Sequence, residues 1–366
     1  MKAVRGETVE AVDEGRCALP RAAPNVTVLE PRRNHCCSRG LLSRSLNGIS
    51  GKEEHDVPEE SRDDHCDRRG LARDARQGRP FFFSTGNADG RLGALSQPPN
   101  AGKLETETAD DFILTETTTI SQATIVGLIP SGTPLGQISN VEVEVYHVFP
   151  TDSAIPPSGS VPSRMNSPAD VEIGTATRDG SLGTLSFGAT LLNASSSVLN
   201  TVVTGIHKAP ANVTHGEGPA SGELVQITIA FNPPILLPAD HYFFRPEVLV
   251  TGTDFLYVSA PRPIVPPGTP FVGDLQAWIR NSDLKPDWLR IGTDIIDGSP
   301  TPTFSMTFSL AGETIPEAGT PGQANCHGKS ASAVAKQFGG FDAAAAALGY
   351  SSVNALQDAL KTFCGR

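Results

Sequence analysis

Apolar and polar residues alternate in several short runs between residues 80 and 310, and this period of two constrains the fold more than any other feature. One such run interleaves two glutamates with Val141, Val143 and Val145. Successive side chains of a β-strand point to opposite faces of a sheet, so this run predicts a strand with one buried face. Residues 222–231 repeat the pattern and predict a second strand of the same kind.

Further strands are predicted at residues 110–115, 119–129, 183–191, 241–250, 254–259 and 304–310. No amphipathic helical run separates these segments, and the 36 glycines and 30 prolines of the chain favour many turns. Residues 151–170 are rich in Pro and Ser and predict a long surface loop. We therefore expect a mainly β fold, an antiparallel, jelly-roll-like β-sandwich, over residues 80–312.

The end of the chain differs in composition from the predicted sandwich. Residues 313–325 are rich in Gly, Pro and Thr and predict a linker. Residues 326–366 contain Ala-rich helical runs bracketed by Cys326 and Cys364, which predicts a small α-helical module closed by a disulfide. Such a bridge would stabilise the module by about 2–4 kcal/mol and would indicate an oxidising compartment. The alternative is a pair of free buried thiols.

Residues 1–79 resemble neither of these regions. They are rich in Arg, hold four of the six cysteines and show no regular periodicity, so we expect a disordered extension or a mis-annotated start that replaces a signal peptide. A zinc site could be drawn from Cys36, Cys37, His65 and Cys66. It lacks the paired cysteine spacing of structural zinc sites, so the hypothesis is set aside.

The charge distribution bears on the choice of partner. Residues 80–366 hold 14 of the 29 Lys and Arg residues but 26 of the 40 Asp and Glu residues, a net charge of −12. An acidic surface repels phosphate backbones and anionic lipid, so we expect no nucleic-acid partner. No run of 18 apolar residues predicts a membrane span, and no secretory signal is visible at the start of the sequence.

Two tryptophans, Trp278 and Trp288, lie in a Pro-flanked region at residues 271–297. An exposed pair could stack on the apolar faces of sugar rings, which makes both residues candidates for ligand binding. The alternative is that each indole is a large buried residue of the core or a plug beneath a loop.

Asp110 and Asp111 begin one of the predicted strands and are candidate metal ligands. Because adjacent side chains of a strand point to opposite faces, only one can face a given site. One of them, with loop carbonyls and Asp294 or Asp297, could hold Ca²⁺, which accepts six to eight oxygen ligands. In the alternative, one carboxylate caps a turn and the other is solvated. No other cofactor is expected.

Signatures of catalysis are absent from the sequence. It contains neither HExxH nor GxSxG, and no spacing singles out two carboxylates for glycoside hydrolysis. The string from His215 to Gly218 is the most unusual one in a predicted loop. Loops of this kind carry function in many proteins, which makes it a candidate. We interpret it as a turn.

Several strings resemble a group of uncharacterised exported proteins of soil and plant-associated bacteria. They are FFFSTGNADGR, ADDFILTETTTISQATIVG, VEVYHVFPTDS, LPADHYFFRPEV and PDWLRIGTDI. The tail from Asn325 to Cys364 resembles a separate C-terminal module found on such proteins. The resemblance implies export and a jelly-roll-like sandwich, and it implies no particular activity or catalytic residue.

We therefore expect a secreted or cell-surface protein that serves as a binding or structural module without catalytic activity, with an extracellular glycan as candidate partner. The alternative is a hydrolase or lyase that acts on polysaccharides, because jelly-roll sandwiches also host those activities. The sequence defines neither the ligand nor the oligomeric state.

Overall fold

The computed structural model describes residues 79–153, 158–207, 213–262 and 273–365. All of them belong to the compact unit Cys66–Arg366. The predicted N-terminal extension, residues 1–79, lies outside the described residues except for Arg79.

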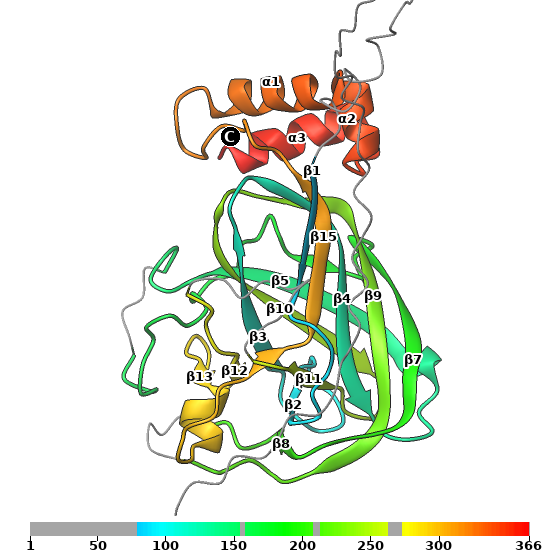
Figure 1. Ribbon diagram of the computed structural model, residues 1–366, viewed down its shortest axis with the longest axis vertical. Coiled ribbons are helices and arrows are strands. Elements are labelled where there is room, and N and C mark those ends of the chain that lie inside the picture. The colour runs from blue at the N-terminus through cyan, green and yellow to red at the C-terminus, as the bar shows by residue number, and fades with distance from the viewer. Residues whose placement is uncertain (1–78, 154–157, 208–212, 263–272, 366) are drawn as a thin grey trace, which may run out of the picture. The chain divides into compact units, whose positions relative to one another are not determined.

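Nine strands form the larger sheet (Figure 1). Its main path runs β1 (Arg79–Ser84), β15 (Phe308–Thr314), β4 (Thr118–Ile129), β11 (Leu256–Ala260), β2 (Leu92–Leu95) and β8 (Asn200–Val202). Off this path, β14 (Ser305–Met306) pairs with β11, β9 (Ala220–Leu237) pairs with β4, and β7 (Leu185–Val198) pairs with β9. The pairings are antiparallel apart from β2 with β8, which is parallel.

Six strands form the second sheet. Its order is β13 (Leu289–Arg290), β12 (Trp278–Asn281), β3 (Thr106–Leu114), β10 (Asp240–Val250), β5 (Ile138–His147) and β6 (Arg178–Asp179). A short 3₁₀ helix, Leu135–Gln137, precedes β5, and a π-helical turn, Ile291–Ile296, follows β13. Every pairing in this sheet is antiparallel.

One hydrophobic core lies between the two sheets. It joins Val143 of β5 and Phe244 of β10 to Ile125 of β4 and Ile227 of β9. Val143 and Ile227 are apolar members of the two alternating runs, so the alternation explains why these side chains face inward. The expected mainly β fold with two layered sheets is confirmed.

Some of the predicted strands match the observed ones closely, and others are longer in the structure. The runs predicted at 119–129 and 241–250 correspond to β4 and β10 within one residue. The strand predicted at 222–231 is longer in the structure, where β9 continues through two prolines and ends at Leu237. Short strands such as β12 and β13 were not predicted, since two to four residues are too few to show a period.

Three helices form the C-terminal module: α1 (Cys326–Phe338), α2 (Phe341–Ala347) and α3 (Val353–Phe363). A disulfide joins Cys326 to Cys364, with the two Cα atoms 5.8 Å apart, so the predicted bridge is confirmed. Ser352 caps α3 by accepting a hydrogen bond from the amide of Ala355. Of the helices in the described residues, none combines the length and apolar character needed to cross a bilayer.

The helical module packs against the sandwich. Its core includes Val334, Leu356 and Leu360, and Leu236 of β9 packs against that core. The predicted linker begins as strand, because β15 ends at Thr314, and Ile315 is buried in the core of the module. Residues 313–315 therefore connect the two parts through packed structure.

Candidate functional site

The outer face of the six-stranded sheet, which points away from the core, carries a network of charged side chains. Because the strands are antiparallel, β10 places Arg245 opposite Glu144 of β5. In the same way, Arg280 of β12 lies opposite Glu107 of β3. Arg245, Glu107 and Arg280 are all buried, so these charges interact in a poorly solvated environment.

Glu107 is the centre of this network. Arg245 Nη2 donates a hydrogen bond to Glu107 Oε1 over 2.9 Å, and Arg280 Nε donates to Oε2. Lys285 Nζ lies 3.2 Å from Oε1. Burial alone would raise the pKa of Glu107, but these cationic groups outweigh burial and lower it to about 2.

Further carboxylates surround Arg245. Its guanidinium contacts Glu144 at 2.5 Å and Glu247 at 3.1 Å. Burial raises the pKa of Glu247 to about 8, although Arg245 opposes this shift. Burial likewise raises the pKa of Glu142 to about 7, again against the effect of Arg245. Glu247 is therefore mostly protonated at neutral pH and Glu142 about half protonated, which reduces the negative charge of the network.

Aromatic side chains cover the network. The Arg280 guanidinium lies 4.1 Å from the centroid of the Trp288 ring, and Tyr146 meets Trp288 edge to face at 5.6 Å. Trp278 belongs to the same buried cluster, together with Phe243. Trp288 lies in residues 282–288, which we call the covering segment.

Trp278 and Trp288 are 1% and 0% exposed. The expectation of an exposed pair for stacking on sugar rings is therefore wrong, and the alternative of buried aromatic residues describes both. The physical reason is that the outer face of this sheet forms a second small core, which needs large apolar side chains to cover the buried charges.

Arg164 ties a loop to the covering segment. Its guanidinium donates to Asp287 Oδ1 over 2.6 Å and also to Asp170 Oδ1. All three side chains are buried. The part of the predicted surface loop that the structure describes is thus anchored by an interior ion pair.

A pocket of about 310 Å³ opens beside Trp278, and we call it the Trp278 pocket. It is lined by Ser163, Met165, Asn166, Arg262, Asp274, Leu275, Gln276, Trp278, Arg290 and Thr303. Trp278 closes part of the wall, but its burial leaves no ring face free for stacking. The volume is at the lower end of the range of about 300–1,000 Å³ that small-molecule sites occupy.

A second hollow of about 630 Å³ adjoins the first. The two share Ser163, Met165 and Asn166, and the second is otherwise lined mainly by apolar residues such as Phe149 and Val161. Met165 is 75% exposed. Met165, which lines both hollows, therefore presents an apolar side chain to solvent between the polar and the apolar hollow.

Two arginines with carboxylate partners line the Trp278 pocket. Arg262 contacts Asp274 at 3.0 Å and donates to the Leu275 carbonyl over 2.8 Å. Arg290 contacts Asp294 at 2.7 Å. Burial raises the pKa of Asp274 to about 6, although Arg262 opposes the shift. The charge of the pocket therefore changes within the physiological pH range.

The structure places Asp110 and Asp111 on opposite faces of β3, as adjacent strand residues require. Asp110 accepts a hydrogen bond from the Met306 amide over 2.7 Å. Asp111 lies 2.6 Å from His241 Nε2 and accepts from the Leu275 amide. Burial raises the pKa of both carboxyl groups.

Both aspartates are buried, so the expected solvated carboxylate is not found. Asp294, a suggested further ligand, is held by Arg290 instead. A Ca²⁺ ion at Asp110 or Asp111 stays a prediction.

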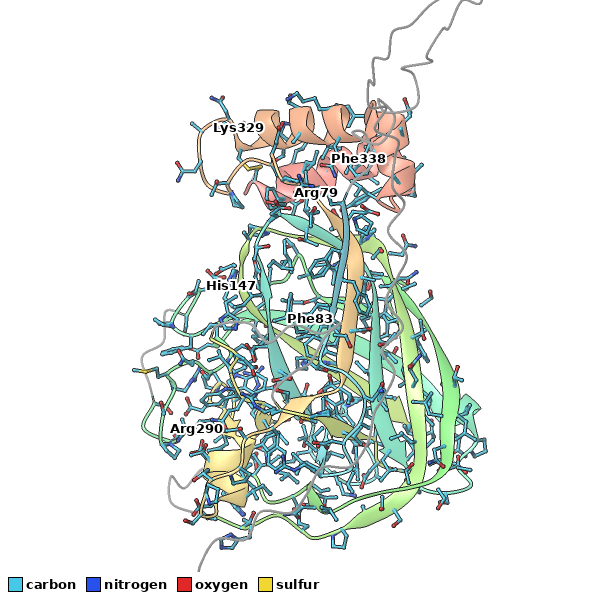
Figure 2. The ribbon with its side chains drawn as sticks, in the orientation of Figure 1. Arg79, Phe83, His147, Arg290, Lys329 and Phe338 are labelled. Carbon is cyan, nitrogen blue, oxygen red and sulfur yellow. A yellow bond between two sulfur atoms is a disulfide. The ribbon has the colours of Figure 1, made fainter. Side chains whose placement is uncertain are left out.

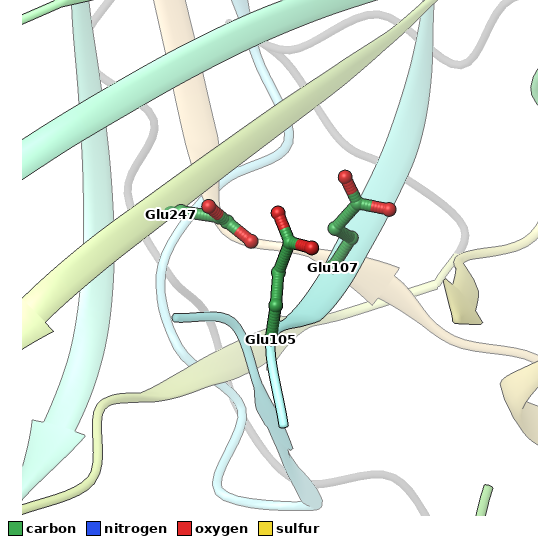
Figure 3. Close-up of side chains that lie close together, drawn as sticks. All are labelled: Glu105, Glu107 and Glu247. Carbon is green, nitrogen blue, oxygen red and sulfur yellow. The ribbon is translucent and has the colours of Figure 1, made fainter. Parts of the chain in front are cut away.

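Three carboxylates that the sequence did not single out converge in Figure 3: Glu105, Glu107 and Glu247. They form the only group of three or more metal-ligand side chains within the described residues, with ligand atoms within 4.8 Å of one another. However, Lys285 Nζ lies 2.9 Å from Glu105 and 3.2 Å from Glu107. A metal ion would have to compete with this ammonium group, so the arrangement favours an ion-pair network over a metal centre.

The segment from His215 to Gly218 is an irregular loop with a bend at Glu217, and its interpretation as a turn stays a prediction. Glu217 Oε1 accepts hydrogen bonds from the amides of Thr204 and Gly205, each over 2.7 Å. His215 has a positive φ of 63°. The carboxylate of Glu217 is thus used to hold the neighbouring backbone.

Sequence reasoning missed the charged network and most of the Trp278 pocket. Glu107 and Arg245 are 138 residues apart, and only the strand order brings them together. A usable signal was present, because β10 carries Arg245 and Glu247 within an otherwise apolar run. Buried charges in such a run require partners on neighbouring strands.

Comparison with protein-family models, with curated proteins and with solved structures finds no match to this chain.

Proposed function

We propose that the chain is an extracellular or cell-surface binding module without catalytic activity, and that the Trp278 pocket binds a carbohydrate. The observation that carries the proposal is the mixed lining of the pocket, in which Met165 and Leu275 lie beside Asn166, Gln276 and two arginines. Sugars present apolar ring faces and many hydroxyl groups, so they need both kinds of contact. The adjoining apolar hollow leaves room for more than one sugar unit.

The disulfide supports the extracellular part of the proposal. Bridges such as Cys326–Cys364 form and persist in oxidising environments outside the cytosol. The helical module is small, so a covalent link supplements its limited core.

The alternative is a polysaccharide hydrolase or lyase, and a hydrolase needs two carboxyl groups on either side of the scissile bond. Asp274 is the one carboxylate among the described residues that line the Trp278 pocket. Its carboxylate is also occupied by an ion pair with Arg262. The pocket therefore offers better support for binding than for hydrolysis.

A glycan array with the full-length chain tests the proposal. We expect binding to a restricted set of oligosaccharides, weakened by Asn166→Ala and unaffected by Lys361→Ala, because Lys361 is exposed on α3. Absence of any bound glycan at high micromolar protein would leave a structural role only. Release of new reducing ends from a bound polysaccharide would favour the hydrolase.

A further inference from the structure

The charge of the Trp278 pocket differs from that of the chain around it. Residues 80–366 carry 14 basic and 26 acidic residues. The lining of the pocket reverses this ratio, because it holds Arg262 and Arg290 with one carboxylate, that of Asp274, while Asp294 pairs with Arg290 from outside the lining. A pocket lined by two arginines in an acidic protein offers anionic ligands donors that the remaining surface lacks.

Arg290 has hydrogen-bonding capacity left over. Its Nε and Nη2 atoms donate to Asp294, and its Nη1 atom makes no hydrogen bond within the described residues. The side chain is 27% exposed, and Figure 2 labels it in β13. An arginine held by a buried carboxylate has a fixed orientation, so its free donors meet a ligand at low entropic cost.

Asp274 competes with an anionic ligand for Arg262. The two side chains form an ion pair at 3.0 Å, and both are largely buried. Asp111 and His241 are the other charged or titratable groups that act on Asp274. Neutralising Asp274 would release donors of Arg262 toward the pocket.

We propose that the Trp278 pocket recognises a carboxylate-bearing sugar, a uronic acid within an oligosaccharide, through Arg290 and Arg262. This inference rests on the proposed function and specifies its ligand. The carboxylate accepts hydrogen bonds from the arginines, while the hydroxyl groups meet Asn166 and Gln276. Neighbouring sugar units extend past Met165 into the adjoining hollow.

The first experiment compares two ligands that differ only in the acid group. Isothermal titration of the full-length chain would use oligogalacturonate and the same oligosaccharide with its carboxyl groups reduced to alcohols. We expect the acidic form to bind at least about tenfold more tightly, which is the effect of one charge-assisted hydrogen bond.

The possible results separate this inference from the proposed function. Equal binding of the two ligands, or tighter binding of the reduced form, overturns the uronic acid assignment and leaves a carbohydrate-binding module. Absence of binding by either ligand and by every glycan on the array overturns both.

The second experiment uses a variant that should gain affinity. Asp274→Asn removes the competing charge and keeps an oxygen acceptor for Arg262, so we expect oligogalacturonate to bind several-fold more tightly at pH 7 and the reduced form to bind as before. A misfolded variant cannot produce this gain. Unchanged or weaker binding of the acidic ligand overturns the inference.

A matched pair of variants completes the test. Arg290→Met should weaken binding of oligogalacturonate about tenfold or more and have little effect on the reduced form. Lys329→Met removes the same charge from an exposed position on α1 and should change neither. Equal loss of both ligands in Arg290→Met, with a retained circular dichroism spectrum, also overturns the assignment.

Discussion

At the scale of single residues, Glu247 shows how a buried network couples stability to pH. Its carboxyl group ordinarily titrates near 4.5, and burial raises its pKa to about 8. Between these two values the folded state holds a proton that the unfolded state has released. The contribution of Glu247 to the free energy of unfolding therefore falls as the pH rises from about 4.5 to about 8 and is then constant. The raised pKa of Glu142 likewise lowers the free energy of unfolding as the pH rises to about 7.

We predict that Glu247→Gln makes the stability of the protein less dependent on pH in this window. The amide mimics the protonated carboxyl group at every pH, so the variant should lose less stability than the original protein between pH 5 and pH 8. Thermal unfolding followed by circular dichroism at both pH values measures the difference. Glu317→Gln is the control, because Glu317 is 69% exposed. Parallel curves for Glu247→Gln and the original protein would contradict the prediction.

Glu107 is expected to have the opposite role. Arg245, Arg280 and Lys285 lower its pKa to about 2, so it stabilises the fold as an ion. Glu107→Gln leaves two buried arginines with one charged partner fewer, and we expect a loss of about 3–5 kcal/mol in the free energy of unfolding. Urea titration at pH 7 measures it. A loss below about 1 kcal/mol would show that neighbouring carboxylates replace Glu107.

At the scale of elements, the covering segment depends on one side chain. Trp288 is fully buried between Arg280 and Tyr146, so Trp288→Ala should cost about 3–5 kcal/mol, whereas Trp288→Phe should cost clearly less. Hydrogen exchange should increase first in the covering segment, residues 282–288. An increase spread evenly over both sheets would contradict this local role.

The success of sequence reasoning at this scale follows from the range of the interactions involved. Alternation is a local property, so it predicted β5 and β9, and Ala-rich runs predicted the three helices. Pairing between strands far apart is not local, and it determines that Arg245 meets Glu107 and that Trp288 is covered. The sequence therefore indicates through Arg245 and Glu247 that buried charges need partners, but it does not identify those partners or the pocket beside Trp278.

At the scale of the whole molecule, the disulfide stabilises one region. It closes a loop of the helical module, with Cys326 and Cys364 separated by 38 positions. Replacing both cysteines by serine should cost about 2–4 kcal/mol. Hydrogen exchange should rise throughout residues 326–364 and stay low in β3 and β10, because the sandwich has its own core. Equal loss of protection in both regions would indicate a single cooperative unit.

The same bridge also determines how the molecule would respond to mechanical load at its C-terminus. Tension on Cys364 passes through the covalent link to Cys326 and leaves the helices between them unloaded. It then reaches β15, which is hydrogen-bonded between β1 and β4. A pull along an interior strand must break all of its hydrogen bonds at the same time. The hydrogen bonds of the larger sheet would therefore resist a force applied at the C-terminus.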